Sequence, residues 1–281
     1  MKLAIRYEAI FSYERPASLS PHLVRIFPRT DLFVKVGETK FSTHASGDVQ
    51  WRRDLFDNLI AYCFYPEHVQ DLPVSLELDL EVQERNPFHF LVDSRGLHMP
   101  CDYSDHERKI LAAFLEPSAP LSLPSPLAPE APRPTVETLV TLNRWIHENL
   151  GYERRDEGDP FSPAETLKRG SGSCRDFGPL LADVLRINGV AARLASGFVW
   201  EGDKELSERR AESAMHAWVE AYLPGAGWIG MDPTNGVFCD HHFVTTAVGL
   251  LHTDISPVAG TYYGNKPIAS TLATQLQVQK A

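Results

Sequence analysis

A proline-rich segment separates two halves of the chain that have different sequence patterns. Seven of the 21 prolines lie between Glu116 and Pro134, where charged residues are few. Proline lacks a backbone N–H and obstructs helices and central strands, so this segment is expected to form a semi-rigid, extended connector. The sequence therefore predicts a first domain over 1–100, a helix and connector over 101–134, and a second domain over 135–281.

The first hundred residues show the alternation of half-buried strands. Apolar side chains alternate with mostly polar neighbours at Leu3, Ile5, Tyr7, Ala9 and Phe11. This period of two is typical of a strand with one buried face. Further short apolar runs, separated by proline and Gly-Asp, lie at 23–27, 33–36, 58–65 and 76–82. Closely spaced strands without intervening helices predict an antiparallel sandwich or barrel, and we expect a β-sandwich-like domain.

The second half begins with helical periodicity and continues with strand patterns. A capping box of the form S-x-x-E at Ser104 starts a helix before the connector. Apolar spacing then predicts helices over 135–150, 162–170 and 174–187. Strand patterns follow at 190–200, 214–222, 228–232 and 243–248. The fold class is therefore predicted to be α+β, with helices packed on an antiparallel sheet in the second domain.

Composition excludes several classes of protein. The net charge of −10 and the pI near 5.5 lack the basic footprint of a nucleic-acid or anionic-membrane binder. No apolar run approaches the ~18 residues that span a bilayer. Charges at Lys2, Arg6 and Glu8 interrupt any signal-peptide core, so we expect a cytoplasmic protein. The four cysteines are too few and too scattered for a disulfide scaffold: Cys63, Cys101, Cys174 and Cys239. The sequence leaves the oligomeric state open.

One cysteine, one histidine and one aspartate occupy positions suited to nucleophilic catalysis. Cys174 opens a predicted helix after a Gly-Ser turn, where free N–H groups and the helix dipole favour a thiolate. The same N–H groups suit the oxyanion that forms when a thiolate attacks a carbonyl. His216 starts a predicted strand and can serve as base and acid. Asp232 ends the neighbouring strand of a predicted hairpin, where it can orient the imidazole.

The residues alone also permit a structural interpretation of these three side chains. Free cysteines are usually small buried hydrophobes, and a lone strand histidine is usually structural. Trp218 shares a strand face with His216, so it can shelter the imidazole, line a cleft or pack in the core. Asp176, in the first helical turn, complements the helix dipole, which favours a structural role.

Four segments resemble the transglutaminase-like superfamily, in the same order and with similar spacing. They are Gly172-Ser173-Cys174-Arg175-Asp176, residues 188–194 (Asn-Gly-Val-Ala-Ala-Arg-Leu), His216-Ala217-Trp218-Val219-Glu220 and residues 227–234 (Gly-Trp-Ile-Gly-Met-Asp-Pro-Thr). The likeness is greatest to bacterial transglutaminase-like proteins of the cysteine protease type. It continues at Arg6-Tyr7-Glu8, Ser20-Pro21-His22, Phe27-Pro28-Arg29 and Trp51-Arg52-Arg53-Asp54, which resemble that group's N-terminal β domain.

This resemblance implies a papain-like, transglutaminase-like core with Cys174 as nucleophile, His216 as general base and acid, and Asp232 as orienting residue. It implies a cysteine protease or amidase that forms an acyl-enzyme on a peptide or protein substrate, with hydrolysis favoured and no cofactor. An amine-accepting transglutaminase and a non-catalytic binding module that retains the fold are the alternatives. Trp218 and Arg175 are candidate substrate-binding residues.

Four further segments carry recognisable patterns. The G-x-G-x-x-G run at 225–230 precedes a strand rather than a helix, so it is interpreted as a turn. The run Cys239-Asp240-His241-His242 lacks a second ligand pair at zinc spacing, so no metal is expected. The charged loop at 201–212 can gate or shape the cleft. Leu250-Leu251-His252 departs from the Arg-Asp-Tyr that usually stands there in the resembling group.

Overall fold

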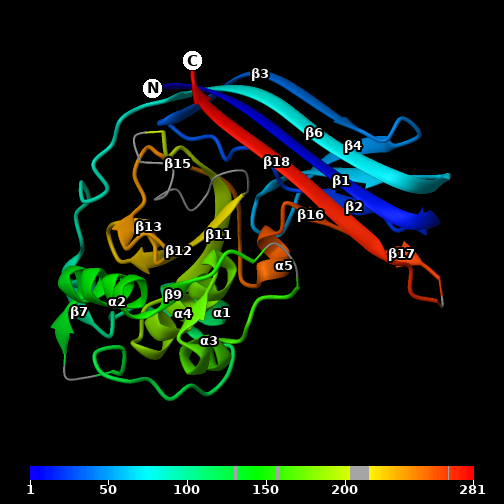
Figure 1. Ribbon diagram of the computed structural model, residues 1–281. Coiled ribbons are helices and arrows are strands. Elements are labelled where there is room, and N and C mark those ends of the chain that lie inside the picture. The colour runs from blue at the N-terminus through cyan, green and yellow to red at the C-terminus, as the bar shows by residue number, and fades with distance from the viewer. Residues whose placement is uncertain (130–131, 156–157, 203–214, 265) are drawn as a thin grey trace.

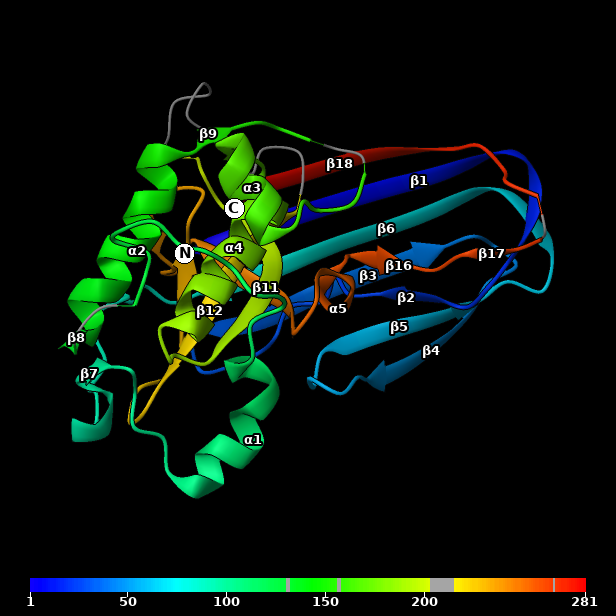
Figure 2. The same ribbon diagram turned by 90° about the horizontal axis from the view of Figure 1, so that it is seen from below.

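The computed structural model describes the chain except for residues 130–131, 156–157, 203–214 and 265. Long antiparallel strands form one part of the molecule, and helices packed on a second antiparallel sheet form the other (Figures 1 and 2). The predicted α+β class, with a sandwich-like N-terminal part and a helix-on-sheet core, is confirmed. The charged loop predicted at 201–212 lies almost entirely outside the described residues.

The N-terminal part consists of two packed antiparallel sheets. One has the order β17-β1-β6-β3, with β18 also paired to β1; the strands are β17 (Tyr262–Tyr263), β1 (Lys2–Leu19), β6 (His68–Val82), β3 (Val34–Thr43) and β18 (Ser270–Lys280). The other has the order β16-β2-β5-β4, from β16 (Val258–Ala259), β2 (His22–Val24), β5 (Leu59–Phe64) and β4 (Asp48–Arg53). The predicted alternation in β1 is present, because Leu3, Ile5 and Tyr7 are buried between the sheets.

The end of the chain returns to the N-terminal sheets. β18 pairs with β1 over eleven residue pairs, from Leu3 opposite Lys280 to Tyr13 opposite Ser270. The two chain ends therefore lie beside each other (Figure 1). The range 135–281 was assigned to the second domain, but its residues 258–280 supply strands to the first. Pairing partners far apart in sequence leave no local signal, and β18 is mostly exposed and polar, so its alternation is weak.

The second part is a five-stranded antiparallel sheet covered by helices on one face. The strand order is β14-β13-β12-β11-β15, from β14 (Val237–Phe238), β13 (Gly227–Asp232), β12 (His216–Leu223), β11 (Ala192–Val199) and β15 (Phe243–Gly249). The helices are α1 (Asp105–Leu115), α2 (Thr135–Asn149), α3 (Pro163–Arg169), α4 (Cys174–Ile187) and the short α5 (His252–Ile255). Short elements complete the fold: η1 (Ser94–Gly96), the pair β7 (His98–Met99) and β8 (Arg133–Pro134), and the pair β9 (Gly151–Tyr152) and β10 (Ser171–Gly172).

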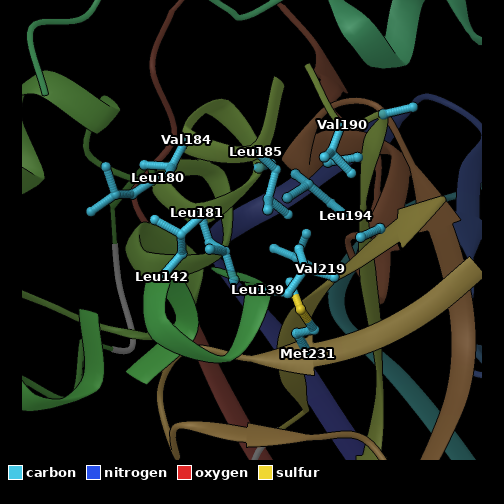
Figure 3. Packing of buried hydrophobic residues seen from close by; sticks show 14 of the residues in the cluster. Leu139, Leu142, Leu180, Leu181, Val184, Leu185, Val190, Leu194, Val219 and Met231 are labelled. Atoms are coloured by element: carbon cyan, nitrogen blue, oxygen red, sulfur yellow. The ribbon is translucent and has the colours of Figure 1, made fainter. Parts of the chain in front are cut away.

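Helix α4 is the centre of this second core. Its leucines pack against α2 on one side and the sheet on the other (Figure 3). Leu181 and Leu185 face Leu139, Val219 and Met231 in that cluster. Close packing on two sides holds the first residue of α4 in a fixed position against strand β12.

The proline-rich connector lies on this core and is not a free linker. Leu127 is fully buried in the helical cluster, and its carbonyl accepts a 2.9 Å hydrogen bond from Asn188 Nδ2. Ser118 donates its backbone N–H to Asp183 on α4 at 3.1 Å. No described helix is long and apolar enough to cross a membrane.

Candidate active site

Cys174 is the first residue of α4, and the turn before it requires small side chains. The Ser173 N–H and Oγ donate to Asp176 Oδ2 at 2.7 and 2.8 Å, which closes a reciprocal cap on the helix. A Cβ added at Gly172 would lie 2.9 Å from Asp176 Cβ. The Gly-Ser-Cys sequence therefore allows Asp176 to fold back beneath the turn and leaves Cys174 partly exposed at the helix N-terminus.

The Asp176 carboxylate is buried and fully engaged by structural partners. Its Oδ1 accepts from Arg155 Nη2 and from the Phe161 backbone N–H, both at 2.7 Å. The guanidinium of Arg155 also lies 3.8 Å from the centre of the Phe161 ring. Asp176 thus ties the loop before α3 to the start of α4, in line with the structural role expected of it.

His216 and Asp232 meet at one end of the central strand pair. His216 begins β12 and Asp232 ends β13, and these strands are antiparallel neighbours with Val219 opposite Met231. His216 Nε2 lies 2.9 Å from Asp232 Oδ2, and the side chains of both residues are completely buried. The hairpin predicted from the Pro-Gly-Ala-Gly turn therefore produces the expected histidine–aspartate contact.

Asp232 is held by a turn that sequence reasoning missed. Its Oδ1 accepts the Thr234 N–H at 2.8 Å, and its Oδ2 accepts Asn235 Nδ2 at 2.6 Å. His147 of α2 holds the same turn through a 2.8 Å hydrogen bond between its Nδ1 and the Thr234 carbonyl. The signal for this turn was present, because an Asp two residues before a free N–H commonly forms an Asx turn. The contribution of His147 comes from a distant helix and had no local signal.

The three candidate residues are electrostatically coupled. Burial lowers the pKa of His216, but the charges of Asp232 and Cys174 outweigh it and place the pKa well above its ordinary value. Burial raises the pKa of the Cys174 thiol, but the charge of His216, hydrogen bonds to His216 and a hydrogen bond from the Ala217 N–H bring it below its ordinary value. For Asp232, burial raises the pKa, whereas His216 and the turn residues lower it overall. The arrangement favours a thiolate beside an imidazolium.

One nitrogen of the His216 ring, Nδ1, is available for proton transfer. Nε2 is occupied by Asp232, whereas Nδ1 is buried, and its interaction with the Cys174 thiol is the only one it makes among the described residues. Because the Asp232 carboxylate fixes the ring, Nδ1 is the nitrogen that is available to the Cys174 thiol and to a substrate's leaving group. The N-terminus of an α-helix presents backbone N–H groups and the positive end of the dipole, so the start of α4, where Cys174 lies, is suited to bind an oxyanion.

Trp218 and Arg175, the two candidate substrate-binding residues, lie in different settings. Trp218 is buried, and its ring is nearly parallel to that of His216, with 6.4 Å between the ring centres. Trp218 therefore packs behind the imidazole. The guanidinium of Arg175 donates to the carbonyls of Arg155 and Gly158 at 2.7 and 3.2 Å. Arg175 thus holds a loop beside the nucleophile.

The other cysteines are buried, and burial raises the pKa of each thiol: Cys63, Cys101 and Cys239. Beside Cys239, Asp240, His241 and His242 place one ligand atom each within 4.8 Å of the others. His242 Nδ1 already pairs with Asp240 Oδ1 at 2.8 Å, and its ring stacks on Trp200. These interactions hold Asp240 and His242 in the loop before β15.

Fold and site together define an α+β protein with cysteine, histidine and aspartate brought together at a helix N-terminus and a strand hairpin. Residues 125–233 match the family model "Transglutaminase-like superfamily", and residues 3–81 match "Bacterial transglutaminase-like N-terminal region". The chain belongs to the transglutaminase-like superfamily and carries its bacterial N-terminal region.

Individual relatives agree with this assignment. A mycobacterial protein described as uncharacterised, from Mycobacterium leprae (strain TN), is 31% identical over 128 residues, which cover 46% of this chain and 45% of that protein. The chain spans about half the length of the first curated relatives it matches. A "Protein-glutamine gamma-glutamyltransferase" of Pseudomonas aeruginosa is 27% identical over 36% of this chain and 16% of its own length.

A solved structure shares the fold over the whole chain. It is described as a "Putative Cysteine Protease" from Cytophaga hutchinsonii and aligns with a TM-score of 0.63 at 16% identity. The alignment covers 100% of this chain and 91% of that chain. At this identity the likeness shows the common fold, including the N-terminal sheets.

Proposed function

We propose that this protein is a thiol enzyme that cleaves amide bonds of a peptide or protein through an acyl-enzyme intermediate on Cys174. The observation that carries the proposal is the coupled set of Cys174, His216 and Asp232, in which Asp232 holds His216 Nε2 and Nδ1 is left to the Cys174 thiol. A thiol, an imidazole and a carboxylate that shift one another's pKa values in this way are typical of a catalytic site.

The proposed reaction follows from these positions. The Cys174 thiolate attacks the amide carbonyl and forms a carbon–sulfur bond, while the oxyanion is held by the N–H groups at the start of α4. His216 then donates its proton to the leaving amine as the carbon–nitrogen bond breaks. A water molecule gives a proton back to His216 and attacks the thioester, the carbon–sulfur bond breaks, and the acid is released with the thiolate and imidazolium restored. Asp232 stabilises the imidazolium at both stages.

Transfer to an amine is the second candidate. It uses the same acyl-enzyme but replaces water with an amine, and the name of the Pseudomonas relative favours it. The choice between the acceptors depends on how well the closed site excludes water. A non-catalytic binding module is the third candidate, and the presence of all three side chains in one hydrogen-bonded and coupled set weighs against it.

The test is to trap the intermediate and its products by mass spectrometry. The protein is incubated with a mixture of glutamine- and asparagine-containing peptide amides, with and without hydroxylamine. We expect a thioester on Cys174, free acid in water, and hydroxamate when hydroxylamine is present. Cys174→Ala should abolish all three, whereas the matched control Cys63→Ala, in the N-terminal domain, should retain them. Equal processing by Cys174→Ala would refute the proposal.

A further inference from the structure

A cavity outside the catalytic constellation lies where the two parts of the molecule meet. It has a volume of about 600 Å³ and is lined from both domains. Arg29 follows β2 and Arg85 follows β6, whereas Trp218, Trp228 and Phe243 come from the second sheet. The chain after β6 passes along that sheet (Figure 1), and Phe88 packs on Phe238 with 4.7 Å between ring centres.

Two guanidinium groups in the cavity wall have no carboxylate within ion-pair distance among the described residues. Arg29 Nη1 donates to the Phe56 carbonyl at 3.1 Å and to Asn58 Oδ1 at 2.9 Å, which are both neutral acceptors. Arg85 Nη2 donates to the Asp240 carbonyl at 3.3 Å, and its Nε is buried without a partner. A buried guanidinium N–H without an acceptor is unfavourable, so these side chains are suited to receive an anion.

The acidic residues of the wall are engaged elsewhere or face solvent. Glu220 Oε2 accepts from Arg193 Nε at 2.8 Å and from its Nη2 at 2.7 Å. Asp31 Oδ1 accepts the backbone N–H groups of Phe33 and of Val34, the first residue of β3. Glu84 is exposed. Burial, and then the charge of Arg193, lower the pKa of Arg29, and the charges of Glu220, Asp57 and Asp54 only partly offset them.

Apolar and aromatic side chains share the rest of the wall with polar ones, and the wall approaches the catalytic histidine. Trp228 lies under the Arg193 guanidinium, with 4.1 Å between the Arg193 Cζ and the ring centre. Trp218 lines the cavity and stacks behind His216, so a single aromatic ring separates the cavity from the imidazole. Phe243 packs edge-on against that ring at 5.4 Å. A ligand in the cavity therefore lies on the same face of the sheet as His216 and Asp232.

We propose that this cavity is a substrate subsite that binds a carboxylate carried next to an apolar or aromatic group on a peptide. Arg29 and Arg85 bind the carboxylate, and the aromatic wall with Trp228 receives the apolar group. The inference rests on the proposed function only in assigning the ligand to a peptide substrate. The cavity's preference for an apolar carboxylate can be measured without turnover.

The test is direct binding to the Cys174→Ala protein, so that no bond is cleaved. The probe is N-acetyl-phenylalaninate, and its matched neutral control is N-acetyl-phenylalaninamide; inorganic phosphate tests for charge alone. Binding is followed by calorimetry and by the fluorescence of the tryptophans in the wall. We expect the acid to bind at least about tenfold more tightly than the amide, as for the gain of one charge-assisted hydrogen bond. Phosphate should bind more weakly than the acid.

Two variants then locate the site. Arg85→Gln should lower the affinity for the acid about tenfold and leave the affinity for the amide unchanged. Arg85→Lys should restore part of this affinity, whereas the exposed Arg144→Gln on α2 should have no effect. Equal affinity for acid and amide, phosphate binding as tight as the acid, or an unchanged Arg85→Gln variant would overturn the subsite. If the wild-type protein cleaves no peptide amide while Cys174→Ala still prefers the acid, the proposed function alone is refuted.

Discussion

Helix α4 places one buried ionic cluster at its start and another near its end, and the two are built differently. At the end, Arg186 pairs with Asp183 at 3.1 Å, and the side chains of both residues are almost fully buried. Arg186 also donates from Nε and Nη2 to the Ala192 carbonyl, and Asp183 accepts from the backbone and hydroxyl of Ser118. At the start, in the cluster of Cys174, His216 and Asp232, His216 Nδ1 interacts among the described residues only with the Cys174 thiol.

This difference separates a structural cluster from a reactive one. In the Asp183 cluster the guanidinium stays charged at any ordinary pH, so the charges are fixed and every neighbour can be a permanent hydrogen-bond partner. In the Cys174 cluster the position of the proton depends on the balance between burial and neighbouring charge. A proton that can move between the imidazole and the thiol is what a catalytic pair requires.

The largest expected effect comes from removing the movable proton. His216→Ala should lower kcat/KM for amide cleavage by at least about 10³-fold, because base, acid and thiolate activation are lost together. The measurement is steady-state cleavage of a peptide amide, with circular dichroism to check the fold. His106→Ala, an exposed histidine on α1, is the matched control and should behave like wild type. Wild-type turnover in His216→Ala would remove His216 from the mechanism.

The matching change at the other end of α4 should affect stability and not chemistry. Asp183→Asn leaves the buried Arg186 charge uncompensated, which should cost about 3–5 kcal/mol in the free energy of unfolding. Urea denaturation measures this cost. The exposed pair of Arg144 and Glu148, 3.9 Å apart, gives the control: Glu148→Gln should change the free energy by less than about 0.5 kcal/mol. A small effect of Asp183→Asn would mean that the cluster is not a structural one.

Asp232→Asn tests whether the charge beside His216 matters as well as its geometry. An amide still fits the turn but removes the charge that stabilises the imidazolium, so kcat should fall by about 10²-fold or more, less than for His216→Ala. The measurement is kcat and KM for the same peptide amide. Unchanged kinetics would show that Asp232 acts only as a structural residue of the turn.

The features that were predictable from sequence are those encoded locally. The alternation of β1, the capped starts of α1, α3 and α4, and the hairpin that brings His216 to Asp232 all depend on neighbours within a few residues. The pairing of β12 with β13 was predictable because a tight turn between two strands makes them antiparallel neighbours. The positions of the nucleophile and its partners followed from these local elements.

The features that were missed depend on contacts between distant segments. β18 pairs with β1 across most of the chain, and His147 reaches the Asp232 turn from a helix that carries no mark of that role. Arg175 and Trp218 were predicted as substrate-binding residues from their positions beside Cys174 and His216. Which groups their side chains contact depends on the packed loop and sheet. Such contacts follow from tertiary packing, which no local pattern encodes.

The pH dependence of alkylation measures the balance of charges at Cys174 directly. Its pKa lies below the ordinary thiol value, so iodoacetamide should react with a midpoint below that of a free cysteine, near 8.5. The reactive thiolate is present above this midpoint and lost as the pH falls through it. In His216→Ala the opposing charge is gone while burial remains, so the midpoint should rise by about one unit or more. Peptide mass spectrometry measures the alkylation of each cysteine separately. An unchanged midpoint in His216→Ala would show that His216 does not lower the pKa of Cys174.

The smallest expected effect concerns Asn235, which donates to Asp232 at 2.6 Å. Asn235→Ala removes one hydrogen bond to a charged group, so kcat should fall about tenfold while KM stays similar. Asn235→Asp is the sharper test, because it places a like charge beside Asp232 and raises the pKa of that carboxyl. The acid limb of the kcat profile should then move to higher pH, whereas Asn235→Ala should lower the plateau with a smaller shift. If both variants lower the plateau and neither moves the acid limb, Asn235 only supports the turn, and the Cys174 cluster is tuned by His216 and Asp232 alone.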